Sequence, residues 1–568
     1  MARHIYTLGL IAALQGVVVG QGTLPQVDLG YEIHQAISLN ETTQLYNFSN
    51  IRYAQAPVGE LRFAAPVAPE GRNETPQNGS VGRICPQAYP AWGLIATEFT
   101  RAYVTGNLSS FNFTESEQEL QALLASGVNS SEEEPDPRIS EDCLFLDVIV
   151  PRTIFDNANN LRRKRQNAGA PVLVWIYGGG YVAGEKNSYG SPAGLINASR
   201  ADGGDGIIYV AMNYRLGAFG FLAGPSLQAE GGVSNAGLYD QRLALEWVQD
   251  NIHLFGGDPN QVTIMGESAG GGSVEHQITA FGGERGVPFQ KAIVQSPGFA
   301  PVTSQYTQEN TTQEFLALLN VSTIAEARNL SSEAVIRANA LQVLTASYSN
   351  LVYGPVVDGV FAPSLPGLAL ARGSFAENVS VMVGHNTLES PSFSPPFVQT
   401  NEELTDFLSE MYASAPPEVV ETLVTEIYPA EYNGTQPYSS ALERTLLIVQ
   451  EGSFVCNNDY LNRGFDNQTY SYMFQVPPAL HGQDVAYTFY DGQGSNLALG
   501  LLAPVAQVFQ AILVNFAKNG DPNGPGVPNF PIYGENATML AINVTYIEPR
   551  PDNTANPRCA WWQKSLLF

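Results

Sequence analysis

The chain has 568 residues, of which 44% are hydrophobic and 14% are charged. This composition is typical of a globular protein with a sizeable core. Acidic residues outnumber basic ones by 54 to 27, which gives a formal net charge of −27 at pH 7. Nucleic acids and anionic membranes reward clustered Lys and Arg, so this balance argues against both as partners.

Residues 1–20 have the pattern of a secretory signal peptide. An apolar run from Ile5 to Val19 follows a basic start, and small residues come next at Gly20 and Gly22. A membrane anchor would need a longer uninterrupted apolar span. We therefore expect a secreted, extracellular protein whose mature chain begins near residue 21.

Sequons and cysteines agree with export. The chain holds sixteen Asn-x-Ser/Thr sequons, which predict a heavily glycosylated surface. An even number of cysteines in an exported chain favours disulfides, and four cysteines allow three pairings. Nested or sequential closure is geometrically simplest, and of these we predict the sequential pairs Cys85–Cys143 and Cys456–Cys559. A redox or metal role is the weaker interpretation, because no Cys-x-x-Cys occurs.

The middle third of the chain alternates strands and helices. "PVLVWIY" (171–177) and "IIYVAMNY" (207–214) are short apolar runs suited to strands buried on both faces. Residues 235–256 have helical spacing and end at glycine. A strand at 261–265 then leads through a sharp turn into another helix. This order predicts an α/β fold with a mostly parallel central sheet flanked by helices.

Residues 178–180 are three glycines directly after the first of these strands. They let backbone N–H groups approach a substrate closely. Gly178, Gly180 and Ala183 also fit the Gly-x-Gly-x-x-Ala pattern of dinucleotide-binding proteins. We reject that function because the next strand ends without an acidic residue to hold a ribose.

The stretch "MGESAGGGSV" (265–274) places Ser268 inside a Gly-x-Ser-x-Gly frame. A serine hydroxyl is a poor nucleophile until a base removes its proton. A tight turn from strand to helix lifts the hydroxyl out of the sheet and directs the helix N-terminus at developing negative charge. This context makes Ser268 the candidate nucleophile.

Three histidines follow Ser268 in the chain. In the order Ser, acid, His, the base comes last. His276 is two helical turns from the serine, and His385 precedes the best acid. His481 lies in a loop rich in Pro and Gly, and elimination leaves it as the candidate base.

Two acidic residues compete for the role of orienting that histidine. Glu389 follows a predicted strand at 379–384, at the edge where catalytic groups of α/β sheets gather. Asp358 precedes Gly359 and is better suited to capping a turn. A carboxylate in this role holds the tautomer of the imidazole and stabilises the imidazolium. The amides of Gly179, Gly180 and Ala269 are the candidate donors of an oxyanion hole.

The apolar stretch from Leu497 to Lys518 is the other membrane candidate. Pro504, Gln507 and Gln510 interrupt it, so we expect a partly buried helix instead of a span. No integral membrane segment is therefore expected after removal of the signal peptide.

Several long motifs together resemble the type-B carboxylesterase/lipase family of α/β-hydrolases. They are "SEDCLFLDVIVP" (140–151), "PVLVWIYGGGYVAG", "NYRLGAFGFL" (213–222), "NAGLYDQRLALEWVQDNI", "GESAGG" and "HGQD". The resemblance covers most of the mature chain and implies a single catalytic α/β-hydrolase domain over 21–568. It implies Ser268 as nucleophile, Glu389 as acid, His481 as base, and Gly179, Gly180 and Ala269 as oxyanion donors. It also implies the Cys85–Cys143 disulfide.

Two departures from the family pattern concern the site. Ser390 and Pro391 follow Glu389, where the family usually has glycine. The segment between Cys85 and Cys143 is unusually long, and it is either a lid over the site or a glycosylated insertion.

The resemblance implies a hydrolase of carboxylic esters that needs no metal or cofactor. Some members of the family lose the triad and act in adhesion, which is the alternative function. Lipase, short-chain carboxylesterase and sterol-ester hydrolase all remain open, as does the oligomeric state.

Overall fold

The computed structural model describes residues 24–125, 136–159, 169–493 and 500–565. The predicted signal peptide lies outside these residues. A sheet of eleven strands runs through the described part of the chain, and a small sheet of three strands lies beside it. The order of the large sheet is β14-β13-β12-β11-β10-β9-β7-β8-β6-β4-β3, and that of the small sheet is β1-β2-β5.

The strands of the large sheet are β3 (Ser38–Asn40), β4 (Leu45–Arg52), β6 (Phe145–Pro151), β7 (Ala170–Ile176), β8 (Ile208–Met212), β9 (Gly257–Glu267), β10 (Lys291–Gln295), β11 (Ser380–Asn386), β12 (Tyr470–Phe474), β13 (Thr538–Ile542) and β14 (Ile547–Pro551). Those of the small sheet are β1 (Gln26–Asp28), β2 (Glu32–Gln35) and β5 (Asn73–Gln77). The segment from β8 through β7, β9, β10, β11 and β12 to β13 is parallel, and the outer strands pair antiparallel.

The helices up to the middle of the chain are α1 (Trp92–Val104), α2 (Phe113–Ala125), α3 (Arg152–Asn159), α4 (Ala193–Ala198), α5 (Gly217–Phe221), α6 (Pro225–Ala229), α7 (Ala236–Asn251), α8 (Ala269–Thr279), α9 (Gln305–Leu318), α10 (Ile324–Arg328) and α11 (Ser332–Leu344). Then come α12 (Pro366–Ala371), α13 (Asn401–Met411), α14 (Pro417–Thr422), α15 (Ala441–Gln450), α16 (Cys456–Gly464), α17 (Gln483–Thr488), α19 (Ala503–Asn519) and α20 (Pro557–Ser565). Two short helical turns also matter for the site, η5 (Pro391–Phe393) and η7 (Glu451–Val455).

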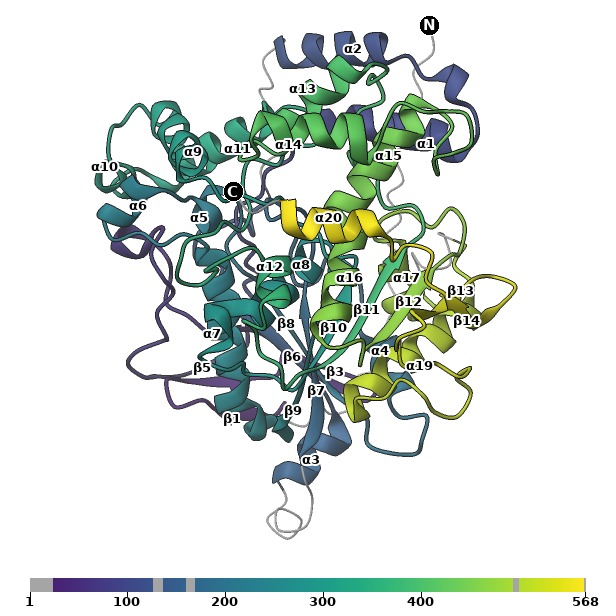
Figure 1. The fold of residues 1–568 in the computed structure, drawn as a ribbon. Helices are drawn as coiled ribbons and strands as arrows, with labels where there is room; N and C mark the ends of the chain where they lie inside the picture. The colour runs from purple at the N-terminus through teal and green to yellow at the C-terminus, as the bar shows by residue number, and fades with distance from the viewer. Residues whose placement is uncertain (1–23, 126–135, 160–168, 494–499, 566–568) are drawn as a thin grey trace, which may run out of the picture.

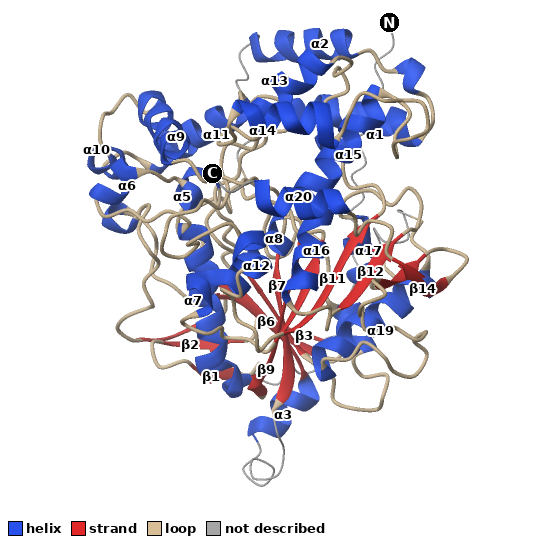
Figure 2. Ribbon diagram, viewed as in Figure 1, coloured by secondary structure: helices blue, strands red, loops and turns tan. Residues whose placement is uncertain are grey.

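Helices cover both faces of the sheet. Helices α8 and α16 pack on β9, β10 and β11. Helix α19 packs on β7 and β9, and α4 and α17 pack on α19. Helices α1, α2, α13, α14 and α15 form a further group above the sheet (Figure 1). Figure 2 shows the strands of the large sheet between the flanking helices, which include α7 and α19. The expected α/β fold with a mostly parallel sheet is confirmed.

The central strands are apolar on both faces because both faces are covered. Every residue of β8 and β10 is buried. The expected helix at 235–256 forms as α7, followed by a short 3₁₀ turn that ends at Gly256 in the left-handed region, with φ of 92°. The expected helix near the C-terminus forms as α19. Within the described chain, no helix combines the length and the apolar character needed to cross a bilayer.

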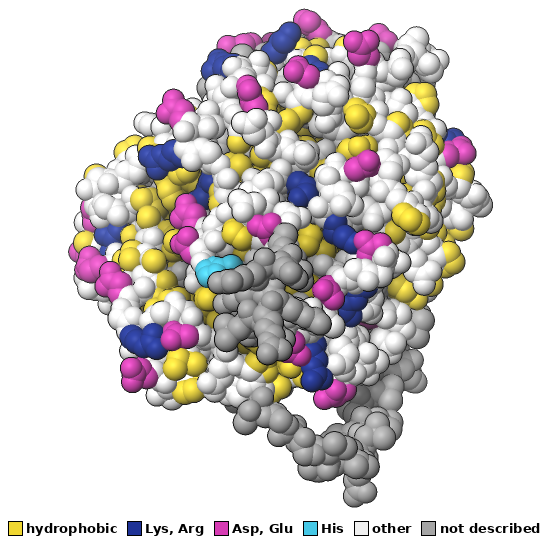
Figure 3. Space-filling view, turned by 90° about the horizontal axis from the view of Figure 1, so that it is seen from below, with side chains coloured by type: hydrophobic (Ala, Val, Ile, Leu, Met, Phe, Trp, Pro, Cys, Tyr) yellow, Lys and Arg dark blue, Asp and Glu magenta, His cyan; other side chains and the backbone are white. Residues whose placement is uncertain are grey.

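Figure 3 shows one face of the molecule, on which charged side chains are dispersed. On the face seen in Figure 3, the basic side chains are scattered among acidic and apolar ones instead of forming one patch. This face therefore offers no concentrated positive charge for a polyanion.

Candidate active site

Ser268 lies in the turn between β9 and α8. Its backbone has φ of 58° and ψ of −123°, a strained conformation for a residue other than glycine. The amide of Ser268 donates to the carbonyl of Gln295 at 3.0 Å, and its own carbonyl accepts from Gly272 at 2.8 Å. A Cβ at Gly270 would overlap the carbonyl oxygen of Ile176. The turn therefore needs glycine close to the serine, as the sequence motif indicates.

His481 lies in the loop between β12 and α17. Its Nε2 is 2.8 Å from Ser268 Oγ, and its Nδ1 is 2.6 Å from Glu389 Oε2. The rings of Phe393 and Phe454 pack against the imidazole with centroids 5.2 Å and 4.5 Å away. The hydrogen bonds and the two aromatic contacts together fix the plane of the ring.

Glu389 follows β11 and is fully buried. Its Oε1 accepts a hydrogen bond from Ser296 Oγ at 2.7 Å and another from the backbone amide of Asn386. Burial raises the pKa of this carboxyl, but the charge and hydrogen bond of His481 and the other donors outweigh burial and lower it. Glu389 is therefore held as a carboxylate.

Asp358, the other candidate acid, lies in a separate turn. Its Oδ1 accepts from the amides of Val360 and Ala362, each at 2.9 Å, and its Oδ2 accepts from Asn235 Nδ2 at 2.9 Å. These bonds are those of a residue that caps a turn. Of the two candidate acids, Glu389 is the one hydrogen-bonded to His481.

The other two histidines are engaged elsewhere. His276 Nδ1 is 2.8 Å from the carbonyl oxygen of Gly272 within α8, and burial lowers the pKa of His276 to about 4. His385 Nδ1 is 2.9 Å from the carbonyl oxygen of Asn386. Of the three histidines that follow the serine, His481 is the one hydrogen-bonded to Ser268.

Gly179 and Gly180 follow β7 beside the serine. Their φ angles of 110° and 64° lie in the left-handed region, which glycine adopts without strain. A Cβ at Gly179 would overlap the carbonyl oxygen of Ala183, and one at Gly180 would overlap Leu351 Cδ1. The amides of Gly179, Gly180 and Ala269 donate to no other group of the described chain. They are free to bind a developing oxyanion.

One cavity of about 850 Å³ is lined by Ser268, His481, Gly179, Gly180 and Ala269. The apolar and aromatic part of its lining includes Trp92, Tyr181, Phe299, Leu351, Phe393 and Phe454. Three glutamates also line it, namely Glu267, Glu314 and Glu410, and the lining in the described chain includes no Lys or Arg. The cavity therefore suits an apolar substrate without negative charge.

The segment between Cys85 and Cys143 forms part of this cavity. Residues 88–90 and Trp92 line it, and Trp92 Nε1 donates to the carbonyl of Asn350 at 2.9 Å. Helix α1 packs on η5, and the hydroxyls of Thr100 in α1 and Ser392 in η5 are hydrogen-bonded at 3.3 Å. In this arrangement α1 is a packed wall beside the site.

Glu267 places a second carboxyl beside the imidazole. Its Oε1 is 3.4 Å from His481 Nε2, and burial raises the pKa of Glu267 to about 8. Burial lowers the pKa of His481, but the charges of Glu267 and Glu389 outweigh burial and raise it to about 9. The proton that Glu267 holds at neutral pH removes one of these charges, which favours the neutral imidazole that a base requires.

A buried network behind Glu389 was missed by sequence reasoning. Asp484 Oδ1 accepts from Asn386 Nδ2 at 3.0 Å, and its Oδ2 accepts from Tyr472 Oη at 2.6 Å and from Gln295 Nε2 at 3.2 Å. Ser296 adds its bond to Glu389. One signal was available, because Gln295 and Ser296 lie where β10 ends, at the same edge of the sheet as the nucleophile.

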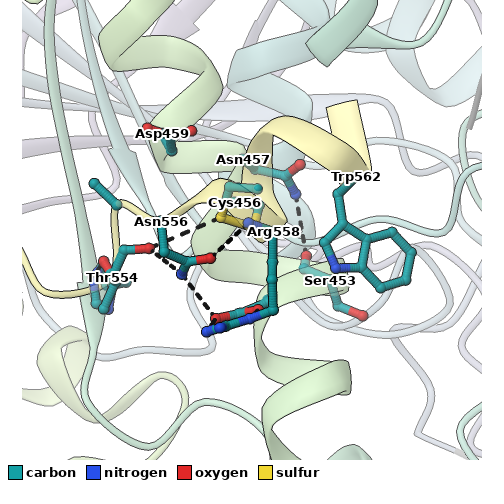
Figure 4. Close-up of a disulfide and its surroundings, with 12 residues drawn as sticks. Ser453, Cys456, Asn457, Asp459, Thr554, Asn556, Arg558 and Trp562 are labelled. Carbon is teal, nitrogen blue, oxygen red and sulfur yellow. Dashed lines mark hydrogen bonds and ion pairs between the residues drawn. A yellow bond between two sulfur atoms is a disulfide. The ribbon is translucent and has the colours of Figure 1, made fainter. Parts of the chain in front are cut away.

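The structure contains both expected disulfides, Cys85–Cys143 and Cys456–Cys559. The second joins α16 to α20 near Arg558 (Figure 4). Arg558 of α20 also pairs with Glu451 at 2.6 Å. Glu451 begins η7, the turn that carries Phe454. The C-terminal helix is thus tied to the element that supports the ring of His481.

Known proteins resemble this chain along most of its length. The model of the Carboxylesterase family matches residues 34–562. The chain is 40% identical to "Carboxylesterase patB" of Penicillium expansum, over 98% of each chain, and 31% identical to a "Secreted lipase" of Arthroderma benhamiae, over 75% of this chain and 83% of that one. Its fold matches that of Aspergillus niger EstA with a TM-score of 0.75 at 24% identity, over 95% of this chain and 98% of that one. The chain belongs to the carboxylesterase family and is a carboxylic ester hydrolase.

Proposed function

We propose that this protein is a secreted serine esterase with a Ser268–His481–Glu389 triad, acting through an acyl-enzyme in one catalytic domain over residues 21–568. The observation that carries the proposal is the pair of hydrogen bonds from His481, 2.8 Å to Ser268 Oγ and 2.6 Å to Glu389 Oε2. A base in contact with both a nucleophile and an orienting acid is the arrangement that serine catalysis requires.

The first half of the reaction acylates the serine. Ser268 Oγ attacks the acyl carbon of the ester while its proton passes to His481 Nε2. The carbonyl oxygen becomes an oxyanion that accepts from the amides of Gly179, Gly180 and Ala269, and each such donor lowers a barrier by about 3 kcal/mol. The imidazolium then protonates the leaving alcohol as the bond between the acyl carbon and the ester oxygen breaks.

The second half of the reaction hydrolyses the acyl-enzyme and regenerates the free enzyme. Water attacks the acyl carbon of the acyl-enzyme, and His481 takes a proton from that water. Collapse of the second tetrahedral intermediate releases the carboxylic acid, and the imidazolium returns its proton to Ser268 Oγ. Glu389 stays ionised throughout and stabilises the imidazolium.

Secretion is supported by three independent features. They are the N-terminal pattern of residues 1–20, the density of sequons and the two disulfides, which persist in oxidising compartments. One relative carries the name "Secreted lipase". Together they support an extracellular, N-glycosylated enzyme.

The test is turnover of p-nitrophenyl esters from acetate to palmitate, below and above the solubility limit of each. Activity confined to dissolved short esters identifies a carboxylesterase. Activity that rises when long-chain esters aggregate identifies a lipase. Turnover that survives Ser268→Ala would overturn the triad, whereas no turnover by a folded wild-type protein would overturn the assigned reaction.

A further inference from the structure

One sequon lies at the mouth of the catalytic cavity. Asn310, Thr311 and Thr312 form an Asn-x-Thr sequon on α9. Among the sequons of the described residues, this is the only one whose asparagine lines the cavity. Asn310 is at the same time exposed to solvent. Its side-chain amide is therefore both accessible and adjacent to the route that a substrate takes.

The orientation of α9 directs this asparagine toward the opening. Thr307, Thr311 and Glu314 line the cavity from the same helix, and Asn310 Nδ2 donates to Glu314 Oε1 at 2.8 Å. Thr312 is buried on the other side, where its hydroxyl donates to the carbonyl of Ala223. The helix thus packs through Thr312 and presents Asn310 at the rim.

The side chains around the cavity mouth determine how a glycan on Asn310 would affect access of the substrate. Exposed apolar side chains occur near it, with Tyr89 of the cavity lining 66% exposed and Tyr306 of α9 81% exposed. Such side chains favour contact with an aggregated, apolar substrate. An N-linked glycan is bulky and strongly hydrated, and it opposes that contact while single molecules pass beside it.

We propose that Asn310 carries an N-linked glycan that screens the mouth of the cavity and restricts the enzyme to dissolved esters. The inference rests on the proposed function, because it requires both export through a glycosylating route and ester hydrolysis. It deepens that function by naming a modification site and the physical state of the substrate.

The first measurement is site occupancy in the enzyme secreted from a eukaryotic host. Mass spectrometry of glycopeptides reports on Asn310 and on two exposed reference sequons away from the cavity, Asn197 and Asn378. We expect Asn310 to carry a glycan. An unmodified Asn310 beside modified Asn197 and Asn378 overturns the inference and leaves secretion standing. If all three are unmodified, the glycosylated route fails, and the inference fails with it.

The second measurement compares dissolved and emulsified esters of one acyl length. Asn310→Gln should raise the ratio of emulsified to dissolved activity several-fold, and Asn378→Gln, the matched control, should leave it unchanged. Enzymatic removal of glycans should give the same rise in the wild type and no further rise in Asn310→Gln. An equal ratio in all variants overturns the screening role, even where Asn310 is glycosylated. Circular dichroism confirms that each variant is folded.

Discussion

The floor and the wall of the catalytic cavity are built in opposite ways. The floor, defined here as the proposed triad of Ser268, Glu389 and His481, is hydrogen-bonded and follows the ends of β9, β11 and β12. The cavity wall, consisting of α1, α9, α13 and residues 345–354, is made of helices and loops above the sheet. In the proposed mechanism the floor carries out the reaction, and we expect the wall to decide which esters reach it.

Backbone geometry shows the same difference. In the floor, Ser268 has φ of 58°, and Gly266 and Gly270, two residues away on either side, have no room for a side chain. In the wall, Ser349 and Val352 have φ of 70° and 68°, although neither is glycine. A β-branched residue in that region is strained. Strain at the serine serves one fixed turn, whereas strain in residues 345–354 places Leu351 against Gly180.

The largest effect is expected from removing the nucleophile. Ser268→Ala should lower kcat for every ester on the order of 10⁵-fold or more, because no hydroxyl remains for the base to activate. The measurement is turnover of p-nitrophenyl acetate, with circular dichroism to confirm the fold. Activity within tenfold of the wild type would show that the floor does not carry the reaction.

The second-largest effect on kcat is expected from replacing the acid, and it distinguishes between the two candidates. Glu389→Gln should lower kcat by roughly 10⁴-fold, because the neutral amide cannot stabilise the imidazolium or hold its tautomer. The matched variant Asp358→Asn should leave kcat nearly unchanged and lower the free energy of unfolding by about 1 kcal/mol, through weaker hydrogen bonds in its turn. The opposite order of rates would move the acid to Asp358.

Much of the floor could be predicted because its parts follow local rules. The glycines around Ser268 indicate a sharp turn, and Glu389 follows a stretch whose apolar residues predict a buried strand. The network of Asp484, Tyr472 and Asn386 was not predictable in the same way. Its members are separated by long stretches of chain, and only the packing of β10, β11 and β12 brings them together.

The wall was less predictable for a related reason. The length of the segment between Cys85 and Cys143 predicted either a lid or a glycosylated insertion, and the choice between them needed partners outside the segment. Those partners are Asn350, which accepts from Trp92, and η5, which packs on α1. The position of Asn310 at the mouth likewise depends on how α9 packs.

A smaller effect should appear where the floor meets the wall. Leu351→Ala opens space beside Gly180 and should raise kcat/KM for bulky esters relative to acetate by about tenfold, the value of a few methylene contacts. Because Leu351 donates no group to the chemistry, kcat for acetate should change little. The check is a series of esters of rising bulk. An unchanged profile would show that this part of the wall does not select substrates.

The smallest effect concerns the charge beside the base. Glu267 ionises near its pKa of about 8, and its charge then raises the pKa of His481, so Glu267→Gln should lower the pKa of His481. Neutral imidazole is the active form, and kcat/KM should therefore reach its plateau at a lower pH than in the wild type, with little difference below pH 7, where both side chains at position 267 are neutral. The measurement is the pH profile of kcat/KM with a neutral ester. A rise displaced to higher pH would contradict the proposed electrostatics.

In the proposed mechanism one serine, activated by His481, carries the acyl group. The most direct measurement is mass spectrometry after treatment with diisopropyl fluorophosphate, in which an activated serine displaces fluoride from phosphorus. We expect one adduct per chain, on the peptide with Ser268, in proportion to lost activity, and no adduct at that position in His481→Ala. An adduct on another serine, or inactivation with Ser268 unmodified, would contradict this mechanism.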